Sequence, residues 1–194
     1  MIKIIRGKYK NINMRVDGDF NIIIKCPKRV PDEKITEFIS SHKRWISLQQ
    51  ERIFNSKQVL NNYDFDNFLY IFGKPYDKTG NKKSDYIELF NKYVIDLLNK
   101  ISVQTGLSYN KVSHINSIRV WGSMDRNKHI KLNLKLLLLN EELVKYVIIH
   151  ELCHTIEFNH SKSFWRAVEK FCPNYKTLVK ELNKYSHVLK ERVF

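Results

Sequence analysis

Apolar residues that favour β-strands are concentrated in short runs over residues 2–26, which predicts β structure there. The runs INMRV and FNIIIKC lie on either side of the short sequence DGD, which predicts a β-hairpin. After Pro31 the apolar positions recur every three or four residues, which predicts a helix over about 33–55. The chain therefore begins with a β-rich part that is followed by a helix.

The rest of the chain mixes helical and strand-like periods. Polar residues predict irregular structure over 55–68 and a loop over 78–85. Strands are predicted over 70–76, 111–121 and 129–133, with WGSMDRNK as the loop between the last two. Helices are predicted over 85–105, 141–157, 161–171 and 174–190. This order predicts an α+β fold, with a β-rich part over 1–80 and a second part over 81–194, or one continuous domain.

The predicted helix over 141–157 contains the sequence HELCH. His150 and His154 are four residues apart, so both side chains leave the same face of a helix. Two imidazoles on one turn can bind one metal ion, and the neighbouring Glu151 can act as general base on a water activated by that ion. The apolar run LVKYVII before this motif indicates a buried helix, in which two histidines need polar partners. The pattern favours a zinc hydrolase over a pair of core histidines.

A catalytic zinc ion is commonly held by three protein ligands and leaves one position open. His160 is the favoured third ligand, because its spacing from His154 matches that of the metzincin histidines. Glu157 occupies the position of the metzincin glycine, and Asn159 can instead end the helix there. Glu157 itself and Glu169 on the next helix are the alternative third ligands. Cys153 lies inside the motif but is expected to turn into the core.

Composition adds a possible partner and a compartment. The chain has 34 Lys and Arg against 20 Asp and Glu, a net charge of +14, which favours nucleic acid or a nucleotide as partner unless the cations only solvate the surface. The three cysteines form no CxxC pair and are expected to be reduced. The N-terminus has no signal-peptide pattern, and no apolar run is long enough to span a membrane. These features predict a cytoplasmic protein.

Several separate motifs, in the same order, resemble the YgjP-like metallopeptidase family, which is related to the SprT-like zinc proteins. They are RVDGDFNIIIKCPKRVP, HKRWI, WGS, IKLN, VKYVIIHELCH, NHSKSFW and PNY. The resemblance implies an α+β, zincin-like fold with the HExxH helix packed on a small sheet. It also implies zinc ligands at His150, His154 and His160 and a catalytic base at Glu151.

The chain departs from that family pattern at two positions. Val120 precedes WGS where the family usually has arginine, and Met124 follows it where the family usually has cysteine. Any substrate contact made by the family arginine is therefore in doubt here. The residues implied to hold zinc are all present.

Three functions follow from these observations. The first is a zinc-dependent peptidase, which requires an open groove beside an edge strand for an extended peptide. The second is a zinc-dependent nucleotide phosphohydrolase with a closed, basic pocket, in which phosphates bind Arg119, Arg126, Lys128 and Lys131. The third is a basic, nucleic-acid-associated protein with a structural zinc ion. The stabiliser of the transition state is left open between His129, Asn133 and a tyrosine.

Overall fold

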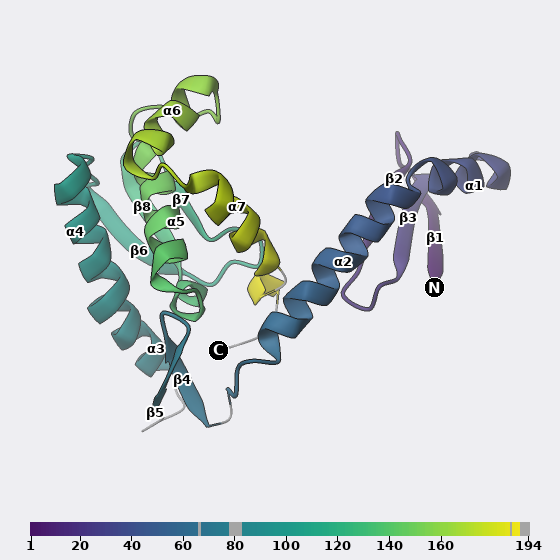
Figure 1. The fold of residues 1–194 in the computed structure, drawn as a ribbon. Helices are drawn as coiled ribbons and strands as arrows, with labels where there is room; N and C mark the ends of the chain where they lie inside the picture. The colour runs from purple at the N-terminus through teal and green to yellow at the C-terminus, as the bar shows by residue number, and fades with distance from the viewer. Residues whose placement is uncertain (66, 78–82, 187, 191–194) are drawn as a thin grey trace. The chain divides into compact units, whose positions relative to one another are not determined.

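A computed structural model describes residues 1–65, 67–77, 83–186 and 188–190 (Figure 1). The chain divides into two compact units, Met1–Leu60 and Asn61–Phe194, and each is described by itself. The boundary predicted between residues 80 and 81 and most of the predicted loop over 78–85 lie outside the described residues. None of the described helices is long and apolar enough to cross a membrane.

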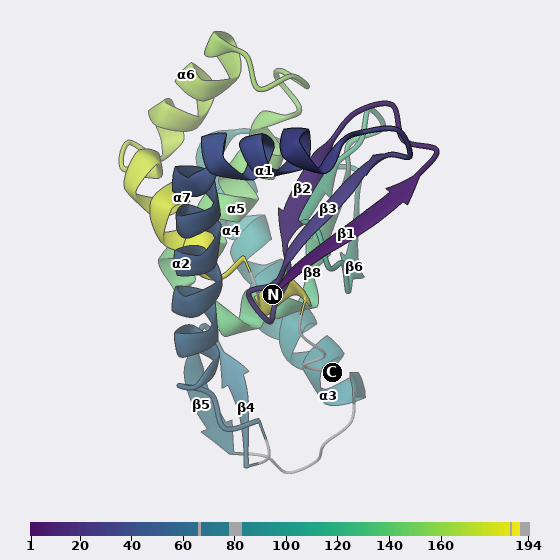
Figure 2. The same ribbon diagram turned by 90° about the vertical axis from the view of Figure 1, so that its right-hand side faces the viewer.

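The first unit packs two helices with a three-stranded sheet. The strands are β1 (Ile2–Gly7), β2 (Asn13–Val16) and β3 (Ile22–Pro27), in the order β1-β3-β2, with β1 parallel and β2 antiparallel to β3. The predicted hairpin is confirmed, and the Asp17 carboxylate accepts backbone N–H groups from Asp19 and Asn21 in its turn. Figure 2 shows α1 (Asp32–Ser41) beside these strands. Its Ile35 joins Ile24 and Cys26 in a small core.

The single helix predicted over 33–55 is wrong, because the structure has two helices there. α1 ends at Ser41, and α2 runs over Lys43–Leu60, which also covers part of the segment expected to be irregular. The Ser41 hydroxyl donates to the carbonyl oxygen of Phe38, and His42 Nδ1 lies 2.8 Å from the same oxygen. These side chains replace the backbone bond that would continue the helix, so His42 N–H bonds to Ile39 instead.

The second unit begins with a hairpin and a long helical segment. β4 (Phe68–Ile71) pairs with β5 (Lys74–Asp77), which adds a second strand to the one predicted near 70–76. α3 (Lys83–Leu89), a π-helical segment (Phe90–Ile95) and α4 (Asp96–Thr105) follow each other directly. As predicted, the segment ends at Gly106, whose φ of 71° suits glycine.

A second three-stranded sheet lies beside the helix that carries HELCH. β6 (Lys111–Ile115), β7 (Gly122–Met124) and β8 (His129–Asn133) are ordered β6-β8-β7, with β6 parallel and β7 antiparallel to β8. Strand β6 is shorter than predicted, because the Ser117 hydroxyl accepts N–H groups from Arg119 and Val120 and starts a turn. The predicted loop WGSMDRNK contains β7, an edge strand of this sheet.

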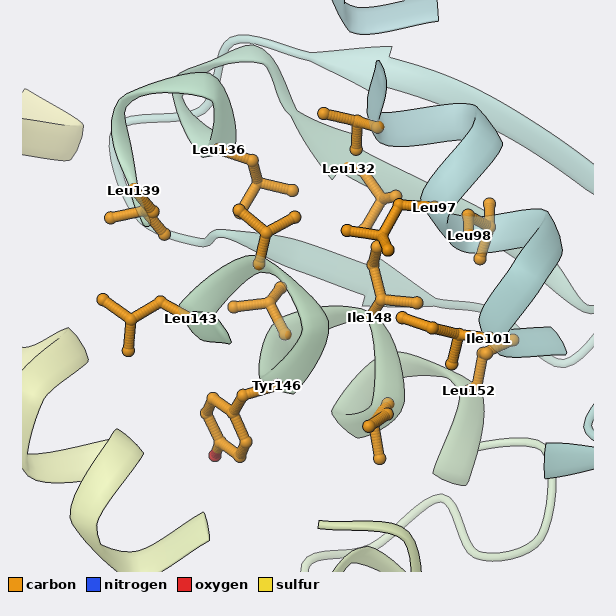
Figure 3. Packing of buried hydrophobic residues seen from close by; sticks show 14 of the residues in the cluster. Leu97, Leu98, Ile101, Leu132, Leu136, Leu139, Leu143, Tyr146, Ile148 and Leu152 are labelled. Atoms are coloured by element: carbon orange, nitrogen blue, oxygen red, sulfur yellow. The ribbon is translucent and has the colours of Figure 1, made fainter. Parts of the chain in front are cut away.

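Helix α5 (Glu141–Cys153) forms the centre of the second unit. A 3₁₀ turn (Leu134–Leu138) leads into it, and α6 (Lys162–Phe171), α7 (Tyr175–Lys184) and a 3₁₀ turn (Val188–Lys190) follow. α5 packs against α4, α6 and α7 and against β7 and β8. Figure 3 shows its apolar side chains among leucines of α4 and β8. The result is a mixed α/β structure, as expected for the fold class.

Two helix ends differ from the prediction. The helix predicted over 141–157 ends at Cys153, because Thr155 bonds the Leu152 carbonyl through both its N–H and its hydroxyl. The last helix ends at Lys184 and not near residue 190. The first of these differences matters for the site, because it lets the chain turn between His154 and His160.

Candidate metal centre and active site

Three histidines meet where α5 ends. His150 and His154 leave the same face of α5, four residues apart, as their spacing predicts. The turn after Cys153 brings His160 to the same place, just before Ser161 caps α6. One ring nitrogen from each histidine lies within 4.8 Å of the others, and the Nε2 atoms of His150 and His160 are 3.1 Å apart.

The three imidazole rings pack against the apolar side chain of Phe164. Phe164, which is completely buried, lies with its ring centroid 4.5–5.0 Å from those of His150, His154 and His160. His154 Nδ1 lies 3.1 Å from the carbonyl oxygen of Glu157. This contact suits a proton on Nδ1, which leaves the Nε2 lone pair of His154 available to a ligand. Phe164 thus packs α6 against α5 and also orients the histidines.

Burial favours the neutral form of His150 and His154. Burial first, and then the nearby His154 and His160, lower the pKa of His150 to about 3. Burial also lowers the pKa of His154. His150 Nδ1 is buried and has no hydrogen-bond partner among the described residues. The three imidazoles form a donor set that suits a divalent metal ion such as Zn²⁺, and the ring of His150 carries a buried nitrogen without a partner in the described part of the chain.

The alternative third ligands lie outside this group. The Glu157 carboxylate accepts the N–H of Asn159 and the hydroxyl of Ser163. Glu169 forms an ion pair with Lys176, at 3.7 Å. Cys153 is fully buried in the core, and burial raises the pKa of its thiol to about 12. His160 is therefore the third donor that the structure places beside His150 and His154.

The side chain of Glu151, which belongs to α5, packs against the edge strand β7. It is 6% exposed, and this burial raises the pKa of its carboxyl to about 8. Gly122 of β7 packs directly against it, because a β-carbon at Gly122 would lie 2.8 Å from Glu151 Cγ and 3.1 Å from Oε1. Only glycine allows the strand to approach the carboxylate so closely.

An open cavity of about 410 Å³ joins the histidines to β7. It has walls from β7 and the segment before it, from α5, from the segment after α5, and from α7. Its lining residues are Val120, Trp121, Gly122, Ser123, Met124, Tyr146, Val147, His150, Glu151, His154, Phe158, His160 and Leu182. Among the described residues, β7 pairs only with β8, so its other edge is free next to this cavity.

None of the four predicted phosphate-binding residues is among those that line the cavity. Lys131 pairs with Ser123, and the alternation of β8 directs it to the face of the sheet away from α5. Arg126 and Lys128 belong to the turn between β7 and β8, and Arg119 belongs to the turn before β7. The cavity therefore lacks the basic lining that was predicted for nucleotide binding.

The structure separates the three candidate transition-state stabilisers. His129 lies on the face of the sheet away from α5, 2.9 Å from the Ser113 hydroxyl. The Asn133 amide donates to the carbonyl oxygens of Ser117 and Val120 and holds the turn before β7. Tyr146 lines the cavity one turn before His150, and Figure 3 shows its ring directed away from the leucines.

The sequence did not identify Gly122, Tyr146, Phe158 or Leu182 as site residues. Tyr146 had a usable signal, since it precedes His150 by four residues and so shares its helix face. Leu182 had none, because it reaches the cavity only through the packing of α7 on α5.

The comparisons with known proteins agree with the motifs. The model of the YgjP-like metallopeptidase domain matches residues 10–88 and 81–185. The chain belongs to the YgjP-like family. The resemblance seen in the sequence is thereby confirmed, and membership implies a metallopeptidase-like hydrolase that uses a metal ion.

The other comparisons are more limited. The crystal structure of the metallopeptidase zymogen of Pyrococcus abyssi abylysin is 32% identical to the chain and matches 46% of it and 90% of the solved chain, with a TM-score of 0.42. No protein with a curated description matches.

Proposed function

We propose that this YgjP-like protein is a zinc-dependent peptidase in which His150, His154 and His160 hold the metal and Glu151 is the general base. One observation supports this most directly: the three histidines open onto a cavity that is bordered by a free edge strand and contains the Glu151 carboxylate. The HExxH helix packed on a small sheet is the arrangement that the zincin-like fold requires.

The histidines and Glu151 have separate roles in this proposal. Bound zinc supplies a Lewis acid, which lowers the pKa of a water molecule and polarises the scissile carbonyl. The positive charge of a bound ion would favour the ionised form of Glu151 against the effect of burial. In that form Glu151 accepts a proton from the attacking water and then donates it to the leaving amine. A carboxylate held in a buried site by Gly122 and α5 loses little freedom when it makes this transfer.

The edge strand and Tyr146 are assigned to the substrate. An extended peptide adds to the free edge of β7 through backbone hydrogen bonds, which places one peptide bond opposite the histidines. Tyr146 lines the same cavity, and burial raises the pKa of its hydroxyl, so this hydroxyl stays protonated and can donate to the developing oxyanion.

Zinc is proposed over other metals because three protein ligands that leave a fourth position open are its common catalytic site, and imidazole is one of its usual ligands. Cobalt, manganese and nickel also bind such donors, so metal analysis of the purified protein is part of the test. The cytoplasm is the proposed location of the protein, on the basis of its cysteine usage.

The experiment compares wild type with Glu151→Gln, both loaded with zinc, on unfolded proteins and peptides and on nucleoside triphosphates. Peptide cleavage by wild type that is lost in the variant supports the proposal. Release of phosphate or pyrophosphate that depends on Glu151, without peptide cleavage, would replace it with the phosphohydrolase.

A further inference from the structure

The cavity beside Glu151 has uncovered apolar side chains at its mouth. Val120 and Phe158 both line it, and they are 41% and 43% exposed. Val120 comes from the segment before β7, and Phe158 comes from the segment after α5. Exposed apolar side chains that border a cavity mark a place where apolar surface of a ligand is buried.

Hydrogen bonds order the backbone that carries Val120 and the backbone next to Phe158. Asn133, which is fully buried, donates to the Val120 carbonyl at 2.8 Å, and the Ser117 hydroxyl accepts the Val120 N–H. Next to Phe158, the Asn159 N–H donates to the Glu157 carboxylate at 3.3 Å. Segments ordered in this way lose little backbone freedom on binding, so the apolar contacts of Val120 and Phe158 contribute to affinity.

The inner walls of the cavity are also apolar. Met124 and Leu182 line it from β7 and from α7. Glu151 is the one carboxylate among the lining residues, and no lysine or arginine is among them. An anionic side chain would lose water here without gaining a lysine or arginine partner from these walls, whereas an apolar side chain would gain burial.

We infer that this cavity binds a large apolar side chain of the peptide, next to the bond that is cut, and that Val120 and Phe158 set this preference. The inference rests on the proposed function, because it specifies the substrate of the same site. Its volume of about 410 Å³ lies within the range of pockets that enclose small ligands. Leucine, methionine and phenylalanine are the preferred side chains.

The test uses peptides that differ at one position beside the cut, with leucine, phenylalanine, alanine, aspartate or lysine there. Val120→Ser and Phe158→Ser should each lower kcat/KM for the leucine and phenylalanine peptides roughly 10-fold or more, and should change the alanine peptide little. Val120→Lys should shift the preference toward aspartate. Ile118→Ser and Ile156→Ser are matched controls, because Ile118 and Ile156 are exposed but do not line the cavity.

Binding gives a readout that does not need turnover. Glu151→Gln should bind the leucine peptide more tightly than the aspartate peptide, and Trp121, which lines the cavity, provides a fluorescence signal for the titration. Adding Val120→Ser to this variant should remove most of that difference. The Ile118→Ser control should retain it.

The outcomes separate the two proposals. Peptide cleavage that depends on Glu151 but shows no preference for large apolar side chains would overturn this inference alone. Selective binding of apolar peptides without any cleavage would overturn the proposed function and would support only the apolar preference of the cavity. Equal binding of all five peptides to Glu151→Gln would overturn the inference whatever the wild type cleaves.

Discussion

Gly122 and Glu151 touch across the boundary between β7 and α5, so closely that a β-carbon on Gly122 would lie 2.8 Å from Glu151 Cγ. Gly122→Ala should therefore displace the Glu151 carboxylate without changing the histidines. We expect roughly a 100-fold loss of kcat with unchanged metal content, because a displacement of about 1 Å has that effect on catalysis.

The control for this substitution is Gly18→Ala, since a β-carbon at Gly18 meets nothing within 4 Å. It should leave both activity and metal content unchanged. Full activity of Gly122→Ala would show that catalysis does not depend on the present position of the Glu151 carboxylate.

Glu151→Gln should retain the metal and lose turnover by roughly 100- to 10,000-fold, the usual contribution of a general base. Metal content is measured by elemental analysis and turnover by peptide cleavage. Glu169→Gln is the matched control, because Glu169 pairs with Lys176 and lies outside the histidine group. Equal loss of metal and activity in Glu151→Gln would contradict its role as a base.

His160→Ala should weaken metal binding at least about 100-fold. Loss of a residue that only hydrogen-bonds to a metal ligand already lowers metal affinity roughly 10- to 100-fold. Competition with a chelating dye measures the affinity. His114→Ala, at an exposed position of β6, should bind metal as wild type does. Unchanged affinity in His160→Ala would show that a different residue completes the site.

Removal of the metal should lower the thermal stability of the second unit. Metal at about a thousandfold excess over its dissociation constant contributes ~4 kcal/mol, which corresponds to roughly 10 °C in Tm for a protein of this size. A thermal scan before and after dialysis against a chelator measures this, and added zinc should restore Tm. If chelation lowers the Tm of His160→Ala as much as that of wild type, the stabilising metal binds away from the three histidines.

The role of the basic charge in nucleic-acid binding is best tested on the first unit, which contains 13 Lys and Arg but only six Asp and Glu. Lys3, Arg15 and Lys25 share the face of its sheet opposite Ile24, because each is in register with Ile23 or two residues from it. If this face binds nucleic acid, replacing all three by glutamine should weaken binding and reduce the slope of log affinity against log salt by about 2 to 3.

Replacement of Lys34, Lys43 and Arg44, which are also exposed, removes the same charge from the helices and is the control. Equal losses in both triple variants would indicate a general charge effect without a defined surface. Binding that does not respond to salt would leave the net charge of +14 as a feature of solubility.

The sequence predicted the local features of the site and missed those that depend on tertiary packing. The spacing of His150 and His154 fixes their shared helix face, so it could be read directly. The segment around Gly122 has too few alternating residues to reveal a strand, and its pairing with β8 makes it one. The break between α1 and α2 at His42 was missed, because the spacing of apolar residues does not reveal side-chain hydrogen bonds to the Phe38 carbonyl.

His154 is the last residue that α5 positions, whereas His160 belongs to the irregular segment before α6. An ion held by both would act as a covalent cross-link does, closing a short ring of backbone between the two histidines. Metal binding would then hold the segment between α5 and α6, which carries Phe158, against α5. Metal uptake would thus complete the substrate-binding wall in the same event that equips the site for chemistry.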